Sequence, residues 1–118
     1  MSRSERVAER IKTIISEILI RDIDDSRLGF VTITKVSVSP DLVNAVIYVS
    51  VMGDDSKKSD SMQALKSATK FIKGILGDKL DLRHVPTIDF TYDDSLEKAS
   101  RVWSLMSKLN GKNSRSDK

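Results

Sequence analysis

The chain contains no cysteine and only one histidine, His84, among its 118 residues. Without cysteine there can be no disulfide framework, no thiolate zinc site and no cysteine nucleophile. This composition fits a protein of the reducing cytosol. The length suits one domain of ordinary size, and the hydrophobic fraction of 39% is enough for a single core.

Long hydrophobic runs are also missing. No segment approaches the roughly 18 consecutive apolar residues of a membrane span. The N-terminal residues 1–6 (MSRSER) lack the apolar core of a signal peptide. We therefore expect a soluble, cytoplasmic protein, and we find no internal repeat that would suggest a second domain.

Candidate catalytic and metal-binding groups are scarce. His84 lies between Arg83 and Val85, with no serine or cysteine nucleophile motif around it. The acidic residues at 22–25 and 93–94 lack the glycine and the terminal glutamate of a calcium loop, and turn or helix-cap roles explain them better. The sequence predicts neither an enzyme nor a metal or cofactor site.

Hydrophobic periodicity predicts a helix followed by a β-hairpin in the first half of the chain. Apolar residues recur at helical spacing over residues 4–21. Residues 30–39 are rich in valine, isoleucine and threonine, and their alternation changes phase near Thr34-Lys35, which predicts a strand with a bulge. After a turn at Ser39–Leu42, clean alternation over residues 45–51 predicts an antiparallel partner strand.

The second half predicts helices around one further strand. The helical pattern over residues 60–81 contains Gly74 and Gly77, so we expect two shorter helices that meet near residues 68–74. A strand follows Pro86. A last helix, capped by Asp94 with Glu97 reaching back, should bury Leu96, Ala99, Trp103 and Met106 and end at Asn110-Gly111.

These elements predict an α+β fold with helices packed on a small three-stranded sheet. Residues 1–110 should form the domain, and residues 111–118 should form a disordered basic tail. Although the formal net charge is only +3, basic residues are concentrated in residues 57–83 and 98–118. Residues 22–56 and 84–97 are net acidic.

Three lysines share one side of the helical segment at residues 66–73. At about 100° per residue, Lys66, Lys70 and Lys73 fall on the face opposite the apolar stripe. One interpretation is a solvated outer face, which is usually charged. However, residues 61–77 contain no aspartate or glutamate that could pair with these lysines within the helix. Aligned, unpaired cations favour a polyanionic partner such as the phosphates of a nucleic acid.

The segment from Arg27 to Ile33 superficially resembles the strand signature of RNA-recognition-motif domains. That signature needs aromatic side chains on which bases stack. Here Leu28 and Ile33 occupy two of the aromatic positions, and only Phe30 remains. The chain also opens with a helix rather than a strand, so this fold is not supported.

A set of short motifs, spread over residues 5–109, resembles the bacterial ribosome-binding factor A family. The resemblance implies a type II KH-like domain with a kinked helix pair at Ala68–Lys70 in place of the usual glycine loop. The chain departs from the family pattern at Lys70 and Ser26, where the family has glycine and proline; Lys70 either straightens this helix pair or leaves the kink in place. The matching segments are Arg6-Val7, Arg27-Leu-Gly29, Val31-Thr-Ile-Thr34, Val38-Ser-Pro-Asp-Leu42, Ile47-Tyr-Val-Ser-Val51, Ala68, Phe71-Ile-Lys73, Leu82-Arg83, Val85-Pro86 and Asp94-Ser95.

The resemblance further implies a non-catalytic assembly factor, and we expect a monomer, which fits a factor that must enter a cleft of the subunit. It would bind free 30S small ribosomal subunits, contact 16S rRNA and promote late 30S maturation, 16S rRNA processing and cold adaptation. An adaptor that docks on a ribosomal protein through the acidic segments is the alternative. The residues predicted to contact RNA phosphates are Lys66, Lys70, Lys73, Lys79 and Arg83, with Arg3, Arg6 and Arg10 as a second cluster that Glu5 and Glu9 partly neutralise.

Overall fold

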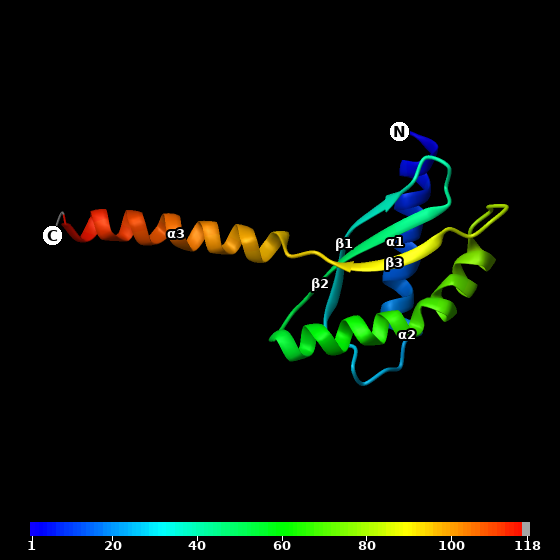
Figure 1. Ribbon diagram of the computed structural model, residues 1–118, viewed down its shortest axis with the longest axis horizontal. Coiled ribbons are helices and arrows are strands. Elements are labelled where there is room, and N and C mark those ends of the chain that lie inside the picture. Colours follow the sequence, from blue (N-terminus) through cyan, green and yellow to red (C-terminus); the bar gives the residue numbers. More distant parts are fainter. Residues whose placement is uncertain (117–118) are drawn as a thin grey trace.

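The computed structural model describes the backbone of residues 1–116 and the side chains of residues 1–109. Three helices and a three-stranded sheet follow one another in the order helix, strand, strand, helix, strand, helix (Figure 1). The elements are α1 (Arg3–Arg21), β1 (Val31–Val38), β2 (Asn44–Val51), α2 (Asp55–Lys79), β3 (Thr87–Tyr92) and α3 (Ser95–Ser116).

The sheet has the order β1-β2-β3 and confirms the predicted hairpin and bulge. β1 pairs antiparallel with β2, and the register shifts between Ile33 and Lys35. Because of this shift, Ile33 and Val36 lie on the same face of the sheet although they are three residues apart. β3 pairs with β2 in parallel, so the chain must cross over between them, and α2 makes this crossover.

The core lies on one face of the sheet, where α1 and α2 cover it. Buried side chains of β2 and β3, among them Ile47, Val49 and Phe90, share one cluster with Ile11 and Ile15 of α1 and with α2 residues. The other face bears Lys35, Tyr48 and Thr91 and has no helix against it among the described elements. The predicted layer of helices on a small sheet is thus confirmed for α1 and α2.

Helix α1 begins at Arg3, and a capping box formed by Ser2 and Glu5 stabilises its start. The Ser2 hydroxyl accepts a hydrogen bond from the Glu5 backbone (3.2 Å), and the Glu5 carboxylate accepts one from the Ser2 backbone (3.3 Å). This arrangement satisfies two backbone N–H groups at the start of the helix. The apolar stripe of the helix, including Ile11, Ile15 and Ile18, is fully buried, as its periodicity predicts.

Helix α2 corrects the prediction of two shorter helices. It is continuous from Asp55 to Lys79, although its ribbon bends toward the C-terminal part (Figure 1). The hydroxyl of Thr69 donates a hydrogen bond to the Leu65 carbonyl oxygen (3.0 Å), a contact that often bends helices without ending them. Gly74 costs helix stability but does not break the helix, because buried side chains such as Ile72 and Leu76 hold it on the core.

Helix α2 also starts five residues earlier than predicted. Residues 53–60 look like a polar loop because they carry no apolar stripe. However, the Asp54 carboxylate accepts a hydrogen bond from the Lys57 backbone (2.9 Å) and caps the helix at this point. A cap of this kind stabilises a first helical turn that has no hydrophobic contacts.

Helix α3 differs most from expectation, because it extends away from the sheet instead of packing on it (Figure 1). Trp103 is 70% exposed and Met106 48% exposed, so the predicted burial of this face is wrong. The helix also continues through Asn110-Gly111, its predicted end, to Ser116. The last two residues of the predicted disordered tail lie outside the described residues, and the domain boundary at residue 110 stays a prediction.

The predicted cap of α3 is correct only in part. Asp94 lies directly before the first helical residue, and its carbonyl oxygen accepts a hydrogen bond from the Lys98 backbone (2.9 Å). Instead of reaching back to Asp94, the Glu97 carboxylate accepts hydrogen bonds from the Tyr92 hydroxyl (2.6 Å) and from Lys58 Nζ of α2. Lys58 also lies over the Tyr92 ring, 5.5 Å from its centre. The start of α3 is therefore tied to both β3 and α2.

In the part of the chain that the structure describes, no helix has both the length and the apolar content to cross a membrane.

Asp93 provides a second tie at the start of α3 and leads to a pH prediction. Hydrogen bonds from Thr34 Oγ1 (2.6 Å) and the Ser95 backbone (2.9 Å) lower the pKa of its carboxyl group to about 2. The unfolded-state pKa is about 3.9. The resulting stabilisation is therefore complete above this value and is lost as the pH falls from about 4 to about 2.

We expect the free energy of unfolding of the wild type to fall more steeply over this pH range than that of Asp93→Asn. Urea denaturation at a series of pH values measures both slopes. Asp94→Asn serves as the control, because the polar contact that the Asp94 side chain makes with the described residues is an exposed ion pair with Lys98. Equal slopes for the wild type and Asp93→Asn would contradict the assigned role.

Candidate nucleic-acid interface

The three predicted lysines form a ridge on α2. Lys66, Lys70 and Lys73, which we call the lysine ridge, are all exposed, whereas Leu65 and Ile72 on the opposite side of the helix are fully buried. From its first lysine to its last, the ridge covers about 10 Å along the helix axis. The helix thus presents its charges on the side away from the core.

The lysine ridge has no internal counter-charge. The salt bridges between described side chains involve Arg27, Lys58 and Lys98, and none involves the ridge. The ammonium groups are therefore hydrated and mutually repulsive in the free protein. A polyanion that binds there relieves this repulsion and releases its own counterions.

Arg10 and Lys79, predicted as separate phosphate contacts, are brought together. Arg10 Nη2 donates a hydrogen bond to the Lys79 carbonyl oxygen at the end of α2 (2.9 Å). A cation at this position also interacts favourably with the negative end of the helix dipole. Arg10 therefore has a structural role that links α1 to α2, and its guanidinium group is less available to a phosphate than the sequence suggests.

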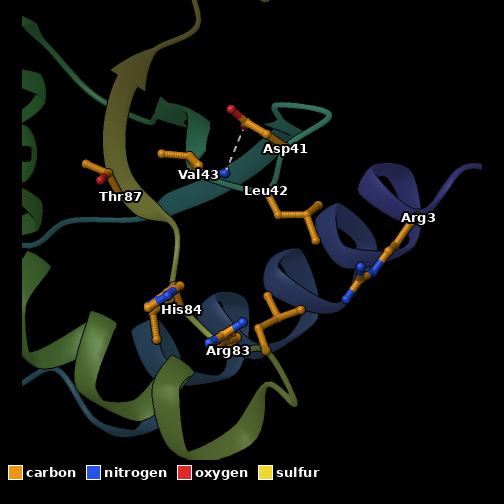
Figure 2. Close-up of a pocket in the computed structure, with 9 residues that line it drawn as sticks. Arg3, Asp41, Leu42, Val43, Arg83, His84 and Thr87 are labelled. Atoms are coloured by element: carbon orange, nitrogen blue, oxygen red, sulfur yellow. Dashed lines mark hydrogen bonds between the residues drawn. The ribbon is translucent and has the colours of Figure 1, made fainter.

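The remaining predicted phosphate contacts, Arg3, Arg6 and Arg83, lie in two different places. Arg3, at the start of α1, and Arg83, in the loop before β3, line the same cavity (Figure 2). Arg6 is exposed on α1. Glu5 is used by the capping box at Ser2, and within residues 1–109 neither Glu5 nor Glu9 makes a salt bridge with an arginine. The predicted neutralisation of this cluster does not occur through ion pairs.

The motif Arg27-Leu-Gly29 anchors the segment before β1 to α2. The Arg27 guanidinium donates to both carboxylate oxygens of Asp25 (2.7 and 3.1 Å) and to the Ser67 hydroxyl (3.2 Å). The Gly29 backbone donates to the hydroxyl of the buried Ser61 (2.9 Å). A Cβ at position 29 would lie 3.3 Å from this hydroxyl oxygen, so glycine allows the close approach. These contacts are structural and leave no free cation for RNA.

Sequence reasoning missed two parts of the surface. The sequence around His84 indicates only that a catalytic role is unsupported, whereas in the structure His84 lines the cavity of Arg3 and Arg83. Leu42 of the Ser39–Leu42 turn lines it too, with a positive φ of 63°. The motif Val38-Ser-Pro-Asp-Leu42 marked this turn, but nothing local indicated that it faces the start of α1. In the described residues, no group of acidic or histidine side chains could hold a metal ion.

Residues 3–106 match the family model described as Ribosome-binding factor A. The chain belongs to this family. A Ribosome-binding factor A from Desulfitobacterium hafniense is 44% identical over 104 residues, which cover 88% of this chain and 83% of the relative. The counterpart from a Synechococcus strain is 46% identical over 109 residues, covering 91% and 76%.

Solved structures of ribosome-binding factor A share the fold. The crystal structure of the protein from Thermus thermophilus matches with a TM-score of 0.67 at 20% identity, covering 75% of this chain and 93% of that one. A homology model of Thermus thermophilus ribosome binding factor A, fitted into a cryo-EM map of a 30S complex, matches with a TM-score of 0.62 at 21% identity, covering 74% and 91%. The predicted KH-like α+β fold is thereby confirmed.

Proposed function

We propose that this protein binds free 30S ribosomal subunits in the cytoplasm as a monomer, through 16S rRNA, and acts without catalysis. Binding would promote the late maturation of the subunit and the processing of 16S rRNA, with the largest benefit in the cold. The observation that carries this proposal is the lysine ridge, whose three exposed cations have no carboxylate partner among the described side chains.

The chemistry of the ridge fits an RNA backbone better than a protein partner. A KH-like helix pair binds consecutive phosphates of a single strand with cations and backbone N–H groups. α2 is continuous through residues 68–70, where the kinked pair was predicted, so the backbone N–H groups there are used within the helix and lysine side chains must supply the contacts. The model of the Thermus thermophilus relative in a 30S complex supports the same partner.

Sedimentation of cell lysate tests the partner. The tagged protein should comigrate with free 30S subunits and be absent from complete ribosomes. A position at the top of the gradient would contradict the proposal. Crosslinking followed by mapping should then place the lysine ridge on 16S rRNA; crosslinks only to a ribosomal protein would favour the adaptor alternative.

Depletion of the protein tests the maturation step. We expect precursor 16S rRNA to accumulate in depleted cells, and to accumulate more at low temperature, as measured by primer extension across the processing sites. An unchanged ratio of precursor to mature 16S rRNA at both temperatures would contradict a role in maturation even if 30S binding is confirmed.

A further inference from the structure

A cavity of about 470 Å³ lies at the end of the molecule where α1 begins. Three separate segments line it: the start of α1, the turn between β1 and β2, and the loop that leads from α2 into β3 (Figure 2). The volume is within the range of about 300–1,000 Å³ that is usual for small-molecule sites. The cavity is not part of the lysine ridge.

Besides Asp41, His84 and Thr87, the lining has an apolar part and a cationic part. One part is apolar and consists of Leu42, Val43, Leu82 and Val85. The other part carries the guanidinium groups of Arg3 and Arg83, neither of which makes a salt bridge with a described carboxylate. Such a surface suits a ligand that is flat and apolar at one end and anionic at the other.

Asp41 is the acidic residue of the lining, but its carboxylate is already engaged. Asp41 Oδ1 accepts hydrogen bonds from the Ser39 hydroxyl (2.7 Å) and the Val43 backbone (3.1 Å), and these bonds lower the pKa of the carboxyl group. The carboxylate thus stabilises the turn rather than pairing with the arginines. Arg3 and Arg83 stay available to an anion.

The walls of the cavity are fixed before any ligand binds. Leu42, with its positive φ, is held by a hydrogen bond from its backbone N–H to the Ser39 carbonyl oxygen (2.8 Å). On the opposite wall, Gly77 of α2 allows Val85 to approach, since a Cβ there would lie 3.2 Å from a Val85 methyl group. A preformed site loses less conformational entropy on binding.

We propose that this cavity holds one unstacked nucleotide of single-stranded RNA. The base lies against the apolar wall of Leu42, Leu82 and Val85, and Arg3 and Arg83 bind the adjoining phosphate. Proteins that recognise single-stranded RNA commonly take up bases that are splayed out of the stack, while cations bind the phosphates. The apolar wall makes the contact tolerant of base identity. This inference rests on the proposed function, because it adds a second contact for the same RNA partner.

Titration with AMP and UMP, followed by amide NMR shifts, tests the pocket directly. The signals of Leu42, Val43 and Thr87 should move, and ribose 5-phosphate should bind more weakly because it lacks the base. Arg3→Gln and Arg83→Gln should each weaken AMP binding about tenfold, the size expected for one charged hydrogen bond. Arg21→Gln, at the far end of α1, is the matched control and should leave AMP binding unchanged.

Three results would overturn the inference. The first is that no amide signal of the cavity residues shifts when AMP is added. The second is equal binding of AMP and ribose 5-phosphate, and the third is failure of a ten-nucleotide single-stranded RNA to displace AMP. Thr87→Glu, which places a carboxylate at the exposed rim, should abolish AMP binding without disturbing the core. If AMP does not bind but substitutions in the lysine ridge still weaken 30S binding, the pocket inference fails while the proposed function stands.

Discussion

Replacing Lys66, Lys70 and Lys73 together by glutamine should weaken binding to the 30S subunit about 100-fold at 0.1 M salt. Each phosphate contact contributes about 0.7–0.9 to the slope of log affinity against log salt, so three contacts contribute about 2–3. At 1 M salt this electrostatic term vanishes, and the wild type and the variant should bind almost equally. Binding measured by filter retention across a salt series gives both the loss and the change in slope.

The control for this prediction is the same loss of charge elsewhere. Arg21, Lys35 and Lys108 are exposed at unconnected positions, and their joint replacement by glutamine should change the slope little. Folding should not be affected in the ridge variant, because surface substitutions of this kind usually change stability by less than about 0.5 kcal/mol. An unchanged salt slope in the ridge variant would show that these lysines do not contact phosphates.

The part of the fold that depends on local periodicity could be predicted from the sequence. The phase change between Ile33 and Val36 predicted the bulge, because a strand that keeps one face buried must insert a residue to do so. The lysine ridge could be predicted for the same reason, since spacing along one helix fixes the face that its residues share. The sequence could not show that the described carboxylates of other elements form no salt bridge with the ridge, because such contacts depend on how the elements pack.

Helix α3 shows the limit of such reasoning. An apolar stripe that includes Trp103 and Met106 indicates that this face is suited to burial, but it does not identify the surface that covers it. The direction of α3 is set instead by contacts between distant residues, Lys58 with Glu97 and Thr34 with Asp93. Neither pair has a recognisable spacing in the sequence.

The cavity at the start of α1 was unpredictable for a related reason. Arg3 and Arg83 are far apart in the sequence, and they line one cavity because β3 pairs in parallel with β2 and so begins at the end of the sheet where the β1–β2 turn lies. Strand direction for a single short strand cannot be read from its own residues. The order of elements allowed either pairing.

Ile47 should be the position where substitution costs most stability. It is fully buried at the centre of the middle strand, opposite Val36 of β1 and Phe90 of β3. Ile47→Ala removes three methyl or methylene groups and leaves a cavity that neighbours in two paired strands cannot easily fill. We expect a loss of about 2–5 kcal/mol, a large part of the roughly 5–15 kcal/mol that stabilises a domain.

The neighbouring position provides a matched test of this expectation. Val46 lies on the same strand but on the open face of the sheet, so Val46→Ala should cost less than about 1 kcal/mol. Ile47→Val, which removes a single methylene group, should cost about 0.5–1.5 kcal/mol. Urea denaturation of the three variants measures the order. Equal losses for Val46→Ala and Ile47→Ala would mean that both faces of β2 are covered, and that α3 or another element packs on the open face in solution.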